Sequence, residues 1–385
     1  MPATRAHSMM PVSNHDELAE QRFVVAFKSY ISAQLDPAVR QLAEDAAQAA
    51  RDESGEPPSL TQLRPQLAKN QLYQNWVSAM RSGQELMWQS AAECVDRQQD
   101  ELNAIAATAP AIGSLQLDPE FVVPRYLAAA DTHMMPGSYY YDPAGGGVRQ
   151  GALFDKAASL YSLGRQGGQT NDMRGQTVVA HVYERFGDLQ PTRILEMGCT
   201  VGNSLVAVAG AFPQAEVHGI DVGASLLRYA HARAAHLGAA LHFRQADAEQ
   251  TGYPDEHFDL VFSSAVLHET SAKALPRIME ECYRILRPGG VMAHLEVPLR
   301  AEAATPFDLV RADFETRYNN EPFWLGAVSA DLAGLATRAG FVDVAAGFQD
   351  AAMGPPRRDV RGGFPTANKG VYRSWYLASG RKPQA

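Results

Sequence analysis

The sequence predicts an α/β fold in the C-terminal half of the chain, preceded by a mostly helical N-terminal half. Between about residues 193 and 296, short apolar runs that suit buried parallel strands alternate with amphipathic helices. The first of these runs, 193–196, ends in an acidic residue and is followed by two glycines four positions apart. The N-terminal half instead carries apolar residues at three- and four-residue steps, which favours helices.

The chain has 385 residues, which is long enough for two domains with separate cores. We expect an N-terminal helical domain over 1–125 and a sheet-containing domain over 175–385. The segment between them, 126–174, is rich in tyrosine and glycine and is expected to act as a linker or lid. It includes Gly164–Asp172, which has the composition of a hinge-like polar loop.

Charge and composition narrow the partners of the protein. The formal net charge is −9, which argues against nucleic acid or an anionic membrane as the dominant partner. Cys94, Cys199 and Cys282 show no paired spacing, which favours a reducing compartment. The sequence shows neither a secretory signal nor an apolar run long enough to span a membrane, so we expect a cytoplasmic protein.

Two amphipathic helical regions are expected in the N-terminal half. The first covers 16–51 and is expected to break at Asp36–Pro37, because proline lacks an amide donor. The second covers 67–108, after the polar loop 52–58. Apolar stripes of this kind usually face a core or an oligomer interface rather than a cofactor.

Seven strands and one prominent helix are expected in the C-terminal half. The helix covers 271–286 and is stopped by Arg287-Pro288-Gly289-Gly290. The strands are expected at 193–196, 216–220, 240–244, 257–264, 291–296, 341–346 and 371–377.

The segment from Glu196 to Gly202, EMGCTVG, predicts a sharp turn from a buried strand into a helix. Free amides at such a helix start can hold a negative group of a ligand. A dinucleotide fingerprint would need glycines at 198, 200 and 203, whereas the chain has Thr200 and Asn203. An NAD-dependent dehydrogenase is therefore disfavoured.

This segment resembles motif I of the class I S-adenosylmethionine-dependent methyltransferases, E/D-x-G-x-G-x-G. Glu196, Gly198 and Gly202 are in register, and Thr200 replaces the middle glycine. The run RILRPGGVM at 284–292 resembles a companion motif of the same family. The resemblance implies a Rossmann-like seven-stranded sheet, S-adenosylmethionine as cofactor and S-adenosylhomocysteine as product. Thr200 indicates either a different turn or a hydroxyl that holds the methionine end.

The resemblance also implies roles for residues that follow the next strands. Asp221 is expected to bind the ribose hydroxyls, although it could instead cap the helix at 225–237. Asp247 is expected to accept from the adenine amino group, with the Ala248 amide on a ring nitrogen, although an acid in this loop also suits a turn. The predicted cofactor site comprises Glu196, Gly198, Cys199, Thr200, Gly202, Asp221, Val222, Asp247, Ala248 and Ser263.

Candidate acceptor residues lie beyond the fourth and fifth strands. His268 titrates near neutral pH and is the candidate general base, although a lone histidine at a strand end is more often structural. Tyr139–Tyr141 precede three glycines, which suits either a cover over a ligand or a connection packed on the sheet edge. No metal-ligand spacing is evident, and no metal is expected. The predicted acceptor site comprises Tyr139, Tyr140, His268, Tyr318, Asn320 and Glu321.

The resemblance implies methyl transfer to an oxygen, nitrogen or sulfur atom of a small metabolite, in specialised metabolism. A protein or peptide acceptor is an alternative, with the N-terminal helices as a docking surface. A second alternative is a cofactor-binding protein without transfer activity, which the departure at Thr200 leaves open. In relatives, helices placed before the sheet act as a lid, as an acceptor-specificity module or as the interface of a homodimer.

Overall fold

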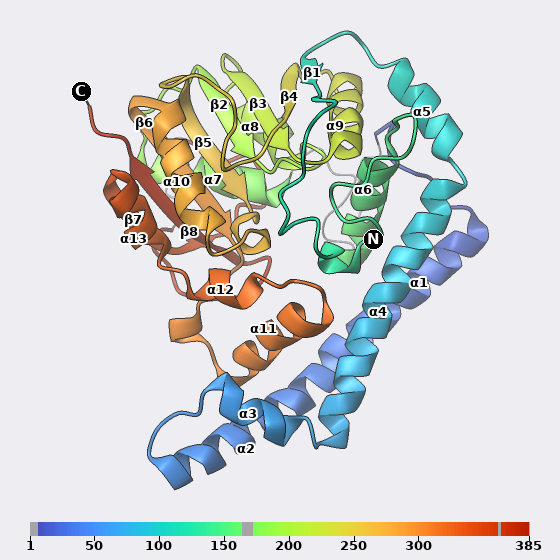
Figure 1. Cartoon of the computed structure of the whole chain (residues 1–385), viewed down its shortest axis with the longest axis vertical. Helices are drawn as coiled ribbons and strands as arrows, with labels where there is room; N and C mark the ends of the chain where they lie inside the picture. Colours follow the sequence, from blue (N-terminus) through green and yellow to red (C-terminus); the bar gives the residue numbers. More distant parts are fainter. Residues whose placement is uncertain (1–6, 164–171, 361–362, 385) are drawn as a thin grey trace.

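The computed structural model describes residues 7–163, 172–360 and 363–384 and contains one mixed sheet of eight strands (Figure 1). The strand order is β1-β4-β3-β2-β5-β6-β8-β7. The predicted hinge-like loop lies outside the described residues, except for Asp172. The strands are β1 (Ser114–Gln116), β2 (Arg193–Met197), β3 (Glu216–Asp221), β4 (Leu241–Gln245), β5 (Phe258–Ser264), β6 (Leu286–Glu296), β7 (Val342–Asp350) and β8 (Ser374–Arg381).

The sheet confirms the predicted Rossmann-like α/β class. Strands β1 to β6 pair in parallel, whereas β8 lies antiparallel between β6 and β7. Because strand order reverses between β2 and β5, their carboxyl ends open a crevice at the centre of the sheet. The seven predicted strands are all present, and β1 adds an eighth that pairs with β4 at the edge.

Helices cover both faces of the sheet. One face packs on α7 (Met173–Arg185), α8 (Asn203–Ala211) and α9 (Ala224–His236), and its core includes Ile194 and Phe262. The other face packs on α10 (Ala274–Ile285) and α13 (Leu332–Ala339), through residues such as Leu195 and Val261. Neighbouring residues of β2 and β5 thus point to opposite faces, and both faces are apolar, as a doubly covered parallel strand requires.

The segment Arg287–Gly290 differs from the predicted helix stop. Helix α10 already ends at Ile285, and β6 begins at Leu286, so the segment lies within the start of the strand. The register of β5 against β6 shifts between Phe258 and Leu260 at this place. The proline and glycines therefore form an irregularity inside the ladder rather than a separate turn.

The N-terminal half is helical, as predicted. The expected break at Asp36–Pro37 is instead a π-helical turn, Ile31–Leu35, in which the Asp36 amide donates to the Ile31 carbonyl. Pro37 then lies in the first turn of the next helix, where its missing amide is tolerated. The helices are α1 (His15–Tyr30), α2 (Asp36–Ser54), α3 (Leu60–Leu67), α4 (Gln71–Asp96) and α5 (Gln99–Ala107).

The N-terminal helices share their core with α11 (Pro306–Tyr318), which follows β6 in the chain. Trp76 of α4 is fully buried, and its ring centroid lies 5.3 Å from that of Phe314 in α11. Figure 1 shows α1, α2 and α4 as an elongated layer beside the sheet, with α11 and α12 (Trp324–Ser329) between them. Helix α6 (Arg149–Tyr161) packs on both α4 and α9. The helices are therefore placed beside the crevice of the sheet.

No helix of the described residues combines the length and the apolar character that crossing a membrane would require.

Candidate functional site

A cavity of about 660 Å³ lies at the carboxyl ends of the central strands. Its walls include residues that follow β2, β3, β4 and β5, together with residues of α1, α4, α6 and α11. The predicted cofactor residues that line it are Glu196, Gly198, Cys199, Thr200, Asp221, Val222, Asp247 and Ala248. This is the position in which open α/β sheets bind ligands.

The turn after β2 keeps its left-handed geometry despite Thr200. The φ angles of Gly198, Thr200 and Gly202 are +70°, +46° and +73°. Glycine adopts this region without steric cost, whereas threonine does so with strain. Thr200 therefore occupies the backbone conformation that suits a glycine, and the turn is not remodelled around it.

Three amides of this turn, which precede the start of α8 at Asn203, are engaged within the protein. The amides of Gly198 and Cys199 both donate to the Ile220 carbonyl at 2.9 Å. The Thr200 amide donates to the Asp221 carboxylate at 2.9 Å. These three donors hold the turn against the end of β3 and are not available to a ligand.

Asp221 is buried at the end of β3, and its carboxylate accepts backbone amides on both oxygens. Its partners are the amides of Thr200 and, at 3.0 Å, Gly223. Burial raises the pKa of Asp221 to about 6, although these amides oppose the shift. Each carboxylate oxygen accepts more than one hydrogen bond. The residue thus organises the loop before α9 without capping that helix, whose N-cap Gly223 has no side-chain cap, and can still accept from a ligand hydroxyl.

Several buried polar atoms in the cavity wall have no hydrogen-bond partner among the described residues. They include Glu196 Oε2, Asn203 Oδ1 and Arg174 Nε, which lie beside the motif turn. Burial raises the pKa of Glu196 to about 8, which the nearby Arg174 guanidinium opposes. An acceptor and a cationic donor in one wall suit the two charged groups of an amino acid. Arg174 and Asn203 were not predicted, because only the packing of α7 and α8 at the turn brings them to the cavity.

Asp247 and Ala248 lie in the loop after β4, as predicted. Asp247 Oδ1 accepts the Glu249 amide at 2.9 Å, which is the turn contact that the alternative interpretation expected. The residue nevertheless lines the cavity, close to Tyr126, which also lies in the wall. The turn contact and a ligand contact are compatible, because Oδ2 of Asp247 stays available when Oδ1 accepts the Glu249 amide.

Gly202 and Ser263 are not among the described residues that line the cavity. Gly202 is the N-cap of α8 and completes the turn. Ser263 is buried in the sheet, where its hydroxyl lies 2.8 Å from His294 Nδ1. Because side chains alternate along a strand, the next residue, Ser264, lines the cavity instead.

Three predicted acceptor residues point away from the cavity. The Tyr140 hydroxyl donates to the Ala128 carbonyl at 3.4 Å. Asn320 Nδ2 donates to the Asp131 carbonyl at 3.2 Å, and Tyr318 packs on Phe314. None of Tyr140, Tyr318 and Asn320 is among the described lining residues. The end of α11 is held by the N-terminal segments, which the sequence pattern did not indicate.

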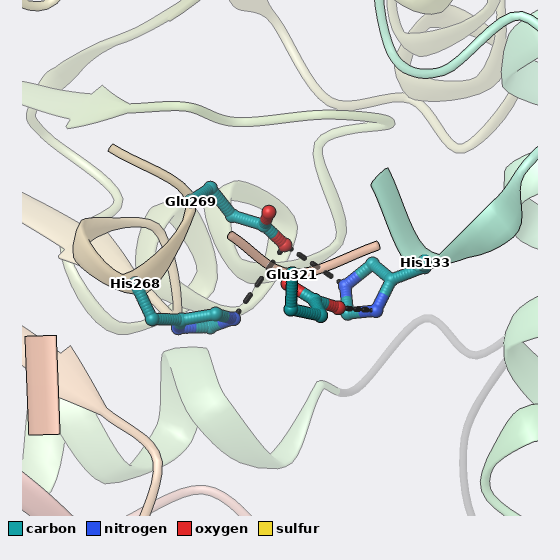
Figure 2. A group of neighbouring side chains, drawn as sticks. All are labelled: His133, His268, Glu269 and Glu321. Atoms are coloured by element: carbon teal, nitrogen blue, oxygen red, sulfur yellow. Dashed lines mark ion pairs between the residues drawn. The ribbon is translucent and has the colours of Figure 1, made fainter. Parts of the chain in front are cut away.

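His268 and Glu321 come together in a cluster with His133 and Glu269 (Figure 2), and Tyr139 joins it through Glu269. His133 Nε2 lies 2.8 Å from Glu269 Oε1, and its Nδ1 is in close contact with Glu321 Oε1. The Tyr139 hydroxyl donates to Glu269 Oε1 at 3.2 Å. Sequence spacing indicated no such cluster, because its members lie in segments that are far apart in the chain.

The surroundings of His268 argue against a neutral imidazole that acts as a general base. Its Nδ1 lies 2.8 Å from Glu296 Oε2, and its Nε2 lies 3.5 Å from Glu269 Oε1. Burial opposes the charged form, yet the carboxylates of Glu296 and Glu269 hold the pKa of His268 well above its usual value. An imidazole that is already protonated cannot take a proton from an acceptor.

Fold and site together define a Rossmann-like protein with a nucleotide-type cavity at the switch point of its sheet. Residues 194–290 match the protein family described as a methyltransferase domain. The C-terminal part of the chain is a class I S-adenosylmethionine-dependent methyltransferase domain, as the motif predicted.

Relatives of known name match a little over a quarter of the chain. Trans-aconitate 2-methyltransferase of Methylobacterium radiotolerans is 39% identical over 105 residues, which is 27% of this chain and 37% of the relative. Fatty-acid O-methyltransferase of Mycolicibacterium smegmatis is 33% identical over 112 residues, 28% of this chain and 38% of the relative. The chain thus spans well under half the length of these two relatives.

Solved structures are similar only in outline. Human N-acetylserotonin methyltransferase in complex with S-adenosylmethionine gives a TM-score of 0.40 at 14% identity, over 61% of this chain and 56% of that one. Phosphoethanolamine N-methyltransferase 2 of Haemonchus contortus gives a TM-score of 0.40 at 18% identity, over 54% of this chain and 53% of that one. The fold class therefore rests on the strand order described above.

Proposed function

We propose that this protein transfers a methyl group from S-adenosylmethionine to a small molecule. The observation that carries the proposal is a single cavity whose walls combine the motif turn, Asp221 and Asp247 with side chains from the N-terminal helices. A cofactor site and an acceptor site would thus share one space. The relatives named above are called after small acceptors, which supports the same class of substrate.

Residues of the cavity suit each part of the cofactor. The unpartnered Glu196 Oε2 would accept from the ammonium of the methionine end, and Arg174 would bind its carboxylate. Asp221 would accept from the ribose hydroxyls, and Asp247 from the adenine amino group. The bound cofactor supplies a methyl group on a positively charged sulfur. The protein has to align the acceptor with that carbon and exclude water.

The shape of the cavity favours a small acceptor over a peptide. Its volume falls within the range of about 300–1,000 Å³ that is typical of small-molecule sites. Gln84 and Trp88 of α4 and Arg311 of α11 add side chains from outside the sheet to its wall. Tyr139 lies in the wall, as expected for a segment that covers a ligand. The N-terminal helices would then set acceptor specificity, and a role in a homodimer stays a prediction.

The geometry of Thr200 removes the reason for proposing a protein without transfer activity. That alternative was left open by the departure at Thr200, and Thr200 keeps a φ of +46° while the turn keeps its contacts with β3. An acceptor in specialised metabolism remains our expectation for the substrate, with oxygen, nitrogen or sulfur as the methylated atom.

Ligand binding followed by product analysis tests the proposed function. We expect calorimetric titration to show binding of S-adenosylhomocysteine in the micromolar range and no binding of NAD⁺. Incubation with S-adenosylmethionine and a panel of small carboxylic acids, amines and thiols should yield a methylated product by mass spectrometry. Binding of NAD⁺ without binding of S-adenosylhomocysteine would contradict the proposal.

Binding of S-adenosylhomocysteine is expected to release a proton at pH 7. Burial keeps the pKa of Glu196 at about 8, so its carboxyl is mostly protonated before the ligand binds. The ligand ammonium favours the ionised form and lowers this pKa, so binding releases close to one proton and strengthens as pH rises towards 8. Calorimetry in buffers of different ionisation enthalpy measures this number. Glu196→Gln should abolish the release; an unchanged release would contradict the role of Glu196.

Replacing Thr200 by glycine is expected to preserve both stability and S-adenosylhomocysteine affinity. Relief of left-handed strain of about 1–2 kcal/mol is offset by about 0.5–1 kcal/mol of added chain entropy in the unfolded state. Thr200→Ala keeps the Cβ atom and should gain nothing. Thermal unfolding and calorimetry check both variants. A loss of affinity of tenfold or more in both would show instead that the hydroxyl holds the ligand.

A further inference from the structure

The cluster that contains His133 and His268 has the composition of a metal site (Figure 2). One ligand atom from each of four side chains lies within 4.8 Å of every other. The four residues come from the segment before α6, from the 3-10 turn Leu267–Glu269 after β5 and from the loop after α11. They are His133, His268, Glu269 and Glu321.

The buried carboxyl of Glu321 gives an independent indication of a cation-binding site. Its side chain is fully buried, and neither oxygen accepts a hydrogen bond from any residue in the described part of the chain. Its one close polar contact there is Oε1 with His133 Nδ1. A carboxylate in this position is costly unless a cation compensates it.

The charges of the cluster also favour a cation. Three carboxylates, those of Glu269, Glu296 and Glu321, contact the two imidazoles of His133 and His268. Three carboxylates thus face two imidazoles within one group of contacts. A divalent ion would satisfy the carboxylates and the imidazole nitrogens together.

His268 is oriented as a metal ligand is. Its Nδ1 lies 2.8 Å from Glu296 Oε2, which leaves Nε2 directed to the cluster. Glu296 in turn accepts the Leu267 amide at 2.7 Å and is thereby fixed. A carboxylate on the far ring nitrogen is the usual support of a metal-binding histidine.

His133 is held in the cluster by α4. Its carbonyl accepts Trp88 Nε1 at 2.7 Å and Gln84 Nε2 at 3.0 Å. These two bonds fix a residue whose φ of +57° is rare outside glycine. The N-terminal helices thus position a ring that the methyltransferase domain itself does not supply.

We propose that His133, His268, Glu269 and Glu321 bind one divalent transition-metal ion, and that this ion binds the acceptor atom during methyl transfer. The second clause rests on the proposed function. Two imidazoles with two carboxylates suit Zn²⁺, Fe²⁺ or Mn²⁺, whereas Mg²⁺ and Ca²⁺ prefer ligand sets made of oxygen alone. The ion is accessible to an acceptor, because His133, His268 and Glu269 also line the cavity.

The ion takes the role of a general base, because both ring nitrogens of His268 are engaged, Nδ1 with Glu296 and Nε2 with the ion. An acceptor hydroxyl or thiol that binds the ion has a lowered pKa and loses its proton to water. Its electron pair forms the bond to the methyl carbon. The bond from that carbon to the positively charged sulfur breaks, and its electron pair stays on sulfur, which becomes a neutral thioether.

Metal titration of the full-length protein tests the site. After removal of metals with a chelator, the protein is titrated with Zn²⁺ and with Co²⁺, and bound metal is counted by elemental analysis. We expect one equivalent for the wild type and a loss of affinity of a hundredfold or more in Glu321→Gln and in His133→Gln. Glu296→Gln should weaken binding by about 10–100-fold. Absence of stoichiometric binding, or binding that survives Glu321→Gln and His133→Gln, would overturn the proposal.

A second histidine group provides the matched control. His242 stacks on His218 with ring centroids 5.0 Å apart, on strands β4 and β3. His242→Gln removes one histidine, as His133→Gln does, and should leave metal binding unchanged. Loss of binding in His242→Gln alone would assign the metal to this group and overturn the proposal.

Two further readouts separate a metal site from a purely structural network. Without metal, Glu321→Gln should unfold at the same temperature as the wild type or higher, because it removes a buried carboxyl that lacks a hydrogen-bond donor. Zn²⁺ should raise the unfolding temperature of the wild type alone. A network of ion pairs predicts instead that Glu321→Gln unfolds at a lower temperature than the wild type without metal. Azide should shift the visible bands of the Co²⁺ protein, and unchanged bands would refute binding of an acceptor to the ion.

S-adenosylhomocysteine binding keeps the two proposals distinguishable. Glu321→Gln and His133→Gln should both retain binding of S-adenosylhomocysteine, because neither residue is among the predicted cofactor residues. A protein that binds metal but not S-adenosylhomocysteine would contradict the proposed function and leave the metal site standing. A protein that binds S-adenosylhomocysteine but no metal would contradict the metal site alone.

Discussion

Replacing Asp221 by alanine is expected to weaken S-adenosylhomocysteine binding by at least about a hundredfold. The two ribose hydroxyls would each lose a hydrogen bond to a charged acceptor, worth about 1.5–3 kcal/mol each, and about 1.4 kcal/mol corresponds to a factor of ten. Asp221→Asn keeps the shape of the side chain and one oxygen, and should lose most of the same affinity. Calorimetric titration measures both variants, with thermal unfolding as the check on folding.

The pH dependence of binding provides a second measure of the same residue. Because burial places the pKa of Asp221 at about 6, the carboxylate is ionised at pH 7 and becomes protonated as pH falls through 6. Wild-type affinity should therefore fall below pH 6, and this fall should be absent in Asp221→Asn.

Asp255→Asn is the control for Asp221. It alters an exposed aspartate of the same domain that pairs with Arg284, and it should bind as the wild type does. Unchanged affinity in a folded Asp221→Ala variant would refute the ribose assignment.

Replacing Gly198 by alanine is expected to destabilise the protein and to abolish S-adenosylhomocysteine binding. An added Cβ atom would lie 2.7 Å and 2.9 Å from the two methyl carbons of Val266, at a φ of +70°. Left-handed strain costs about 1–2 kcal/mol, and overpacking of a stiff β-branched neighbour costs about 1–3 kcal/mol more. A melting temperature lowered by at least about 5 °C is the expected result.

A double-mutant cycle separates the two costs. Val266→Ala removes the methyl groups that the new Cβ atom would meet, so Gly198→Ala combined with Val266→Ala should recover the overpacking part but not the backbone strain. Gly210→Ala in α8 is the matched control, because nothing lies within 4 Å of its added Cβ atom, and it should stabilise the helix slightly. Additive effects of Gly198→Ala and Val266→Ala would contradict the predicted contact.

Features set by neighbouring residues could be predicted from the sequence. The turn at Gly198–Gly202 is fixed by glycines at defined offsets after an apolar run, and Asp221 and Asp247 by their place after the next strands. These positions are local, so the order of strands and turns along the chain was sufficient to place them at the cavity. The irregularity at Arg287–Gly290 was missed because it depends on the register between β5 and β6.

Features set by contacts between distant segments could not be predicted. Arg174 lies at the start of a helix before the first strand of the motif, and nothing in its immediate sequence marks it as part of a site. His133 stands in a segment that was noted for its tyrosines, and its partner Glu321 follows α11. Sequence spacing cannot relate them, because their distance depends on how α11 packs on the N-terminal helices.

The shared core of α11 and the N-terminal helices has a consequence for the order of folding. Phe307, Val310 and Phe314 complete the core that contains Trp76, yet they follow it by more than two hundred positions in the chain. During synthesis, α2 to α4 emerge long before α11 exists, so their apolar face stays uncovered until most of the chain has been made. The final closure of this core therefore waits for α11, which is made after β6, and it comes late in folding although the N-terminal helices are synthesised first.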